Sequence, residues 1–128
     1  MKNILIDANI YIEAMRGNRQ ITEKLRTVET IGVSAISIGE LLAGIKLQKR
    51  PEKYASQLKE FLDAPRVNFL PVTYATADFY SEIYVRLRKA GTPIPTNDLW
   101  IAATALEHGL FIFTLDKHFN HISGLSHF

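Results

Sequence analysis

Short apolar runs alternate along the chain with longer stretches in which apolar residues recur every three or four positions. The runs are NILI at 3–6, IGVS at 31–34, VNFL at 67–70 and LFIF at 110–113. Their length predicts buried strands, and the period of the stretches between them predicts helices. Because strands that alternate with helices are typical of a parallel sheet covered by helices, the pattern favours an α/β fold.

Helix signals lie at both ends of several of these stretches. Pro51 stands at a helix start, and Gly91 and Gly109 allow the left-handed residue with which helices commonly end. The expected helices span residues 9–16, 19–28, 37–47, 51–64, 73–91 and 97–109.

Length and composition limit what the protein can be. With 128 residues we expect a single domain over 1–128. The absence of cysteine excludes disulfides and thiolate metal sites, so any metal ion must use oxygen or nitrogen ligands. No apolar run approaches the ~20 residues of a membrane span, and the stretch before Asp7 is too short for a signal peptide. We therefore expect a cytoplasmic protein with no membrane segment.

The charge balance is mildly basic. A formal net charge of +2 and a pI near 8.9 permit binding to polyanions but do not by themselves indicate it. Basic residues form two small groups, at 46–53 and at 86–89, which are by default solvated helix faces. Both groups stay candidates for contacts with phosphates.

Acidic residues fall where expected strands end or the following helices begin. Asp7 directly follows the first strand and Asp116 follows the fourth, while Glu40 and Asp98 lie in the first turns of helices. In a parallel sheet these positions share one edge, which is where ligands bind in open α/β folds. We expect the side chains to converge there, and we call Asp7, Glu40, Asp98 and Asp116 the acidic rim.

Each of these acids also has an ordinary structural use. Asp7 can cap the first helix, and Glu40 can complete a capping box with Ser37. Asp98 can complement a helix dipole, and Asp116 can be a turn residue. Their joint position favours a binding site for a cation. Two carboxylates about 5 Å apart repel by roughly 3 kcal/mol at an effective dielectric near 20, so such a cluster needs a positive charge beside it. A hard cation, Mg²⁺ or Mn²⁺, would relieve this repulsion and suits phosphodiester hydrolysis.

Several blocks of the sequence resemble the PIN domain family, and within it the VapC-like toxin ribonucleases of toxin–antitoxin pairs. They are ILIDANIYI around Asp7, SAISIGELLAGI around Glu40, PIPTNDLWIAATALEHG around Asp98 and FTLDKHFNHISGL around Asp116. The resemblance implies a three-layer α/β/α PIN-like fold with a parallel central sheet of four or five strands. It also implies a Mg²⁺-dependent endoribonuclease, with Mn²⁺ as a substitute, in which the acidic rim provides both metal ligands and catalytic residues.

Polar residues beside the acidic rim are expected to support it. Asn9 and Thr114 match the small polar positions two residues after the first acid and two before the last, where they would orient ligands or water. Asn97 would do the same beside Asp98 or would only cap its helix.

The resemblance implies partners as well. RNA, often a tRNA or ribosomal RNA, would be the substrate, and its cleavage would arrest translation until a cognate VapB-like antitoxin blocks the site. Leu41, Leu42 and Ile45 follow Glu40 at helical spacing and are expected in the core. Any of them left exposed would form a dimer seam or an antitoxin groove. We expect a homodimer.

Other residues carry weaker signals. His118 and His121 are three residues apart and suggest a metal pair, but with no further nitrogen ligand nearby we expect surface or packing roles for both. Trp100 is expected to pack or to lie in an interface rather than to stack on bases.

Other functions remain open at this point. A housekeeping PIN ribonuclease would act without an antitoxin. An Asp-based phosphatase would need a second Asp two residues after the first, where this chain has Asn9. A metal-free module would bind RNA or protein without cleaving it, although a negative rim gives an RNA binder no advantage.

Overall fold

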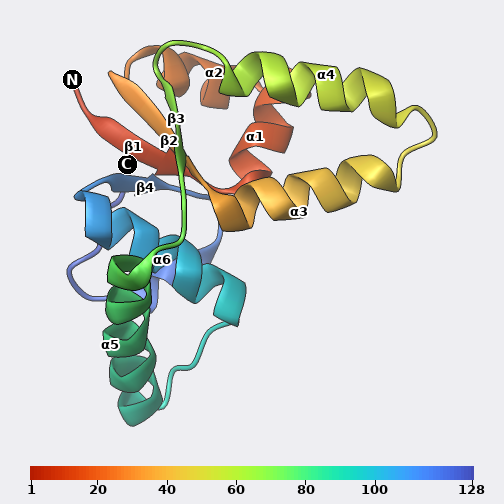
Figure 1. The fold of residues 1–128 in the computed structure, drawn as a ribbon. Coiled ribbons are helices and arrows are strands. Elements are labelled where there is room, and N and C mark those ends of the chain that lie inside the picture. The colour runs from red at the N-terminus through yellow and green to blue at the C-terminus, as the bar shows by residue number, and fades with distance from the viewer.

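The computed structural model describes residues 1–128 as a parallel sheet with helices on both faces (Figure 1). The strands are β1 (Asn3–Ile6), β2 (Thr30–Ser34), β3 (Val67–Leu70) and β4 (Phe111–Phe113). The α-helices are α1 (Ala8–Met15), α2 (Arg19–Arg26), α3 (Ala35–Lys46), α4 (Pro51–Leu62), α5 (Tyr74–Ala90) and α6 (Thr96–His108), and a 3₁₀ helix, η1 (Lys117–His121), follows β4.

The sheet has the strand order β3-β2-β1-β4, and every neighbouring pair is parallel. The last residues of the chain add a single parallel bridge to β4, between Ile112 and His127. There the Ile112 N–H donates to the Ser126 carbonyl and the Phe128 N–H donates to the Ile112 carbonyl, both at 2.8 Å. The expected parallel sheet is confirmed, with four strands and this bridge.

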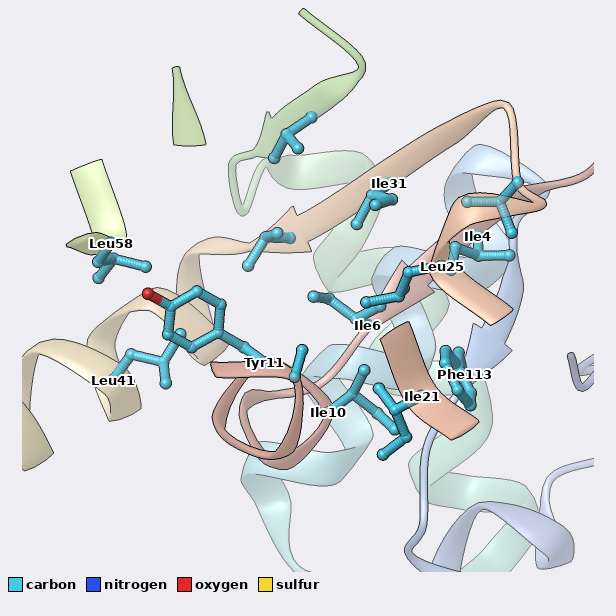
Figure 2. Close-up of a cluster of buried hydrophobic side chains, with 14 residues drawn as sticks. Ile4, Ile6, Ile10, Tyr11, Ile21, Leu25, Ile31, Leu41, Leu58 and Phe113 are labelled. Carbon is cyan, nitrogen blue, oxygen red and sulfur yellow. The ribbon is translucent and has the colours of Figure 1, made fainter. Parts of the chain in front are cut away.

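Both faces of the sheet are covered along β1 and β2, which explains why these inner strands read as apolar runs, whereas the edge strand β3 leaves Asn68 and Phe69 exposed. One core lies between the sheet and α1–α4; Figure 2 shows Ile4 and Ile6 in it together with Tyr11 and Phe113. The other core packs Leu5, which alternates with its neighbours along β1, against α5 and α6. In Figure 1, α1–α4 and α5–α6 lie on opposite sides of the sheet, so the expected three-layer α/β/α architecture is confirmed.

Most helix limits follow the signals in the sequence. The helix α4 begins at Pro51, and α5 and α6 end at Gly91 and Gly109, whose φ angles of 74° and 63° are left-handed. None of the helices combines the length and the apolar character needed to cross a membrane.

The start of α3 differs from the expectation, and the difference changes the interpretation of Glu40. The helix begins at Ala35 because Ser34, the last residue of β2, is itself the N-cap and accepts the Ser37 N–H at 3.1 Å. The alternative in which Glu40 completes a capping box with Ser37 is therefore excluded, and the expectation that Glu40 lies in the first turn is wrong, since it lies in the second turn of α3. The strand passes into the helix without a loop, which an apolar pattern cannot show.

Candidate functional site

Asp7 stands at the carboxyl end of β1 and is buried, with an exposed fraction of 6%. One carboxylate oxygen, Oδ1, accepts the Ile10 N–H at 3.0 Å and caps α1. The other, Oδ2, accepts the Thr114 hydroxyl at 2.5 Å. Asp7 is therefore a helix cap and part of the acidic rim at the same time, since each use takes a different oxygen.

Thr114 joins the ends of β1 and β4. Its hydroxyl donates to Asp7, and its oxygen accepts the Asp116 N–H at 3.0 Å. The bond to Asp7 links residues 107 positions apart in sequence, because β1 and β4 are neighbours in the sheet. Thr114 lies beside the acidic rim, as the sequence predicted. Its two hydrogen bonds fix the carboxylate of Asp7 and the backbone of Asp116.

Asp98 and Asp116 approach one another through His118. Asp98 lies in the first turn of α6 and is 8% exposed, and Asp116 caps η1 by accepting the His118 N–H at 2.8 Å. The His118 Nδ1 atom lies 3.1 Å from Asp98 Oδ2 and 3.1 Å from Asp116 Oδ1. His118 is exposed, in line with the surface role expected for it, and its ring nitrogen also contacts two acids of the rim. Its position two residues after a capping Asp was a usable signal, because the cap turn folds the ring back onto that carboxylate.

Glu40 and Asn97 join α3 to the start of α6. The Asn97 Nδ2 atom donates to Glu40 Oε2 at 3.2 Å, so Asn97 contacts the acidic rim through Glu40. Asn9 is exposed in the first turn of α1 and lines the same groove as Glu40. Its backbone N–H donates to the Asp7 carboxylate, whereas its side chain makes no hydrogen bond to the acids. Trp100 stacks on Tyr80 with ring centroids 4.1 Å apart, so the packing role expected for it is confirmed.

Burial and mutual repulsion raise the pKa of Asp7, Glu40 and Asp98. Burial is the main reason that the pKa of Asp7 lies above its usual value, and the hydrogen bond from Thr114 opposes the change while the charge of Asp116 adds to it. Burial likewise raises the pKa of Asp98, against the hydrogen bond from His118. The pKa of Glu40 is raised by burial and by the charges of Asp98 and Asp7. The acidic rim is therefore a set of interacting charges.

These raised pKa values predict that the stability of the metal-free protein depends on pH. Between the ordinary carboxyl pKa near 4 and the raised values, the folded state holds protons that the unfolded chain has lost. The contribution of these carboxyl groups to the stability of the fold is therefore complete below a pH near 4, and it is lost as the pH rises through the raised pKa values. In EDTA, Asp98→Asn should therefore be more stable than the wild type at pH 7, by about 1 kcal/mol, and this advantage should shrink toward pH 4. Urea unfolding of both proteins across this range measures it, and parallel stability curves would contradict it.

The donor atoms of the site fit a divalent ion. Single ligand atoms from Asp98, Asp116 and His118 lie within 4.8 Å of one another, whereas Asp7 and Glu40 lie beside this group rather than in it. The buried, negatively charged surroundings favour a cation, and carboxylate oxygens and one imidazole nitrogen are ligands for Mg²⁺ and Mn²⁺ or for later transition metals.

A groove opens next to the acidic rim between α1, α3 and α4. It encloses about 570 Å³ and is mostly apolar, with Glu40 in its wall. Leu41 and Ile45 line it, and Met15 and Tyr54, each 39% exposed, leave apolar surface in it. Leu41 is in the core as expected, whereas Leu42 is 41% exposed.

The chain is similar to known proteins in sequence and in structure. The PIN domain family matches residues 4–125. The chain is 36% identical to ribonuclease VapC4 of Mycobacterium tuberculosis over 88 residues, covering 69% of this chain and 68% of that protein. It is 33% identical to plasmid stability protein StbB of Pseudomonas syringae over 123 residues, covering 88% of this chain and 87% of that protein. A crystal structure of VapBC2 from Rickettsia felis bound to a promoter DNA fragment matches with a TM-score of 0.88 and 26% identity, covering 98% of this chain and 96% of the other.

The sheet order, the acidic rim at its carboxyl edge and the match over residues 4–125 define the class: the chain belongs to the PIN domain family. Within that family it is VapC-like, as the sequence resemblance implied.

Proposed function

We propose that this protein is a divalent-metal-dependent endoribonuclease that acts in the cytoplasm as the toxin of a type II toxin–antitoxin system. The observation that carries the proposal is the meeting of Asp7, Asp98 and Asp116 with Glu40 at the edge where β1 and β4 end. Relatives named ribonuclease VapC, and neighbours that are VapBC complexes, support the same function.

Each residue of the proposed site has a part that follows from its contacts. Asp98 and Asp116 would hold Mg²⁺, or Mn²⁺ in its place, with Asp7 and Glu40 adding negative charge beside it. When bound, the ion would activate water and neutralise charge on the phosphate. Thr114 holds the Asp7 carboxylate in one orientation, and Asn97 does so for Glu40.

A tRNA or a ribosomal RNA is the proposed substrate. A folded RNA is recognised mainly by its shape and its unpaired bases, with basic side chains holding the phosphates. The groups at 46–53 and 86–89 are both exposed for the most part, on the α3–α4 turn and on α5. Arg88 donates to the Tyr84 hydroxyl at 2.9 Å, which orders one guanidinium of the second group.

The proposed partner is a VapB-like antitoxin, and the toxin itself is proposed to be a homodimer. The groove between α1, α3 and α4 suits an apolar segment of the antitoxin, because exposed apolar side chains line it. Since Glu40 forms part of the same wall, a segment bound there would end at the acidic rim, where a basic side chain would find carboxylates to pair with.

Cleavage of RNA by the purified protein tests the proposal. With Mg²⁺ or Mn²⁺ we expect endonucleolytic cuts in a tRNA or rRNA. We expect EDTA to abolish them, because the metal-free acidic rim has no positive charge to neutralise the phosphate and no ion to activate water. Release of phosphate from small monoesters would favour a phosphatase instead. Tight RNA binding with no cleavage under any metal would indicate a binding module.

A further inference from the structure

His118 lies in the acidic rim with a nitrogen directed at two carboxylates. Its Nδ1 atom is 3.1 Å from Asp98 Oδ2 and 3.1 Å from Asp116 Oδ1, while its side chain is 51% exposed. The carboxylates come from different elements, since Asp98 belongs to α6 and Asp116 caps η1. The ring is therefore held at the junction of two segments and not only by its own turn.

The arrangement of these atoms suits a metal ion as well as a hydrogen bond. Neighbouring ligand atoms around an octahedral ion, each about 2.1 Å from it, are about 3 Å apart. The two nitrogen–oxygen separations at His118 have this length, and the three ligand atoms lie within 4.8 Å of one another. No other histidine shares the position, because His108 contacts Glu107 and neither His121 nor His127 contacts an acid.

We propose that His118 is a metal ligand of this site, together with Asp98 and Asp116, and that its nitrogen makes the site prefer Mn²⁺ to Mg²⁺. The inference rests on the proposed function, which places a divalent ion at the acidic rim. Mg²⁺ is a hard ion that takes oxygen ligands and keeps its waters, whereas imidazole nitrogen suits the first-row transition metals. An all-carboxylate rim would lack this preference.

The surroundings of His118 favour a ligand role. Asp98 is buried and its Oδ2 atom already faces the ring, so the two side chains need little rearrangement to share an ion. The ring is half exposed and its Nε2 atom makes no hydrogen bond within the protein, so Nε2 can donate to water or to an RNA phosphate while Nδ1 faces the acids.

Electron spin echo spectroscopy of the Mn²⁺ complex tests the inference without any assay of activity. We expect modulation from a coordinated ¹⁴N nucleus in the wild type, replaced by the ¹⁵N pattern when histidine alone is labelled with ¹⁵N. The signal should be lost in His118→Gln, whose amide can still donate to both carboxylates, and kept in the control His121→Gln. A wild-type complex without histidine nitrogen coupling overturns the inference, whether or not the variant folds.

Calorimetric titrations give the matching affinities. We expect His118→Gln to weaken Mn²⁺ binding by about 10–100-fold, as loss of a group that holds or orients a metal does, and Mg²⁺ binding by less than about 3-fold. Equal weakening of both ions would overturn the preference. Cleavage of RNA is measured separately, so that cleavage with no nitrogen coupling rejects only this inference, and nitrogen coupling with no cleavage rejects only the ribonuclease.

Discussion

Asp98→Asn should reduce RNA cleavage by at least about 100-fold while leaving the fold intact. Loss of a group that merely orients a metal ligand costs about 10–100-fold, and Asp98 would be a ligand itself. The amide keeps the size of the side chain and an oxygen for His118, so the first turn of α6 has no reason to unfold. Initial rates on one RNA substrate with Mg²⁺, and separately with Mn²⁺, measure the effect.

Asp63→Asn is the matched control for this variant. Asp63 is exposed at the end of α4, away from the carboxyl edge of β1 and β4, so the same change of charge there should leave cleavage unaltered. Circular dichroism spectra of both variants verify the fold. A rate for Asp98→Asn within a few-fold of the wild type would remove Asp98 from the proposed site and leave it a helix residue near the N-terminal dipole.

Expression of the wild-type chain without a partner should stop bacterial growth, and a small co-encoded protein should restore it. The reason is the proposed cleavage of tRNA or rRNA, which every growing cell requires. Colony counts after induction measure the arrest, and Asp98→Asn should abolish it at equal protein level. Normal growth with abundant, folded wild-type protein would favour a housekeeping ribonuclease instead.

The groove between α1, α3 and α4 gives this prediction a sharper form. Met15→Glu places a charge on exposed apolar surface there, which an apolar antitoxin segment would have to desolvate. We expect this variant to arrest growth as the wild type does but to resist rescue by the partner. Tyr74→Glu, at a side chain 91% exposed on the other layer, should arrest growth and be rescued. Equal rescue of both variants would place the antitoxin elsewhere.

The inner strands of this fold could be predicted well because burial on both faces makes them apolar runs, and the edge strand β3 could be predicted from its short apolar run although Asn68 and Phe69 are exposed. NILI and VNFL match β1 and β3 to the residue, and Gly91 and Gly109 end their helices as their conformational freedom suggests. The start of α3 could not be predicted as well, since Ser34 serves both β2 and the helix cap and two serines compete for that cap. Local hydrogen bonding decided between them.

The acidic rim was accessible to sequence reasoning because Asp7 and Asp116 follow strands that end at one edge. The role of His118 was less accessible. Its contact with Asp98 crosses 20 residues and depends on how η1 sits against α6, which no local pattern encodes. Asn9 shows the opposite case, since its side chain is exposed at a position that matches the family motif and only its backbone N–H donates to Asp7.

The hydrogen bond between Thr114 and Asp7, at the carboxyl ends of β4 and β1, has a consequence for how the acidic rim forms during synthesis. β1 is made before both of its strand partners, and the Asp7–Thr114 bond beside its pairing with β4 spans 107 positions of the chain. Contacts of such separation form late, because the intervening chain must already be ordered to bring them together. A nascent chain that ends before Phe111 therefore carries Asp7, Glu40 and Asp98 without the strand β4 and the Thr114 hydroxyl that hold Asp7 in place. Asp7 is therefore held in its place in the acidic rim only after β4 and Thr114 have been made.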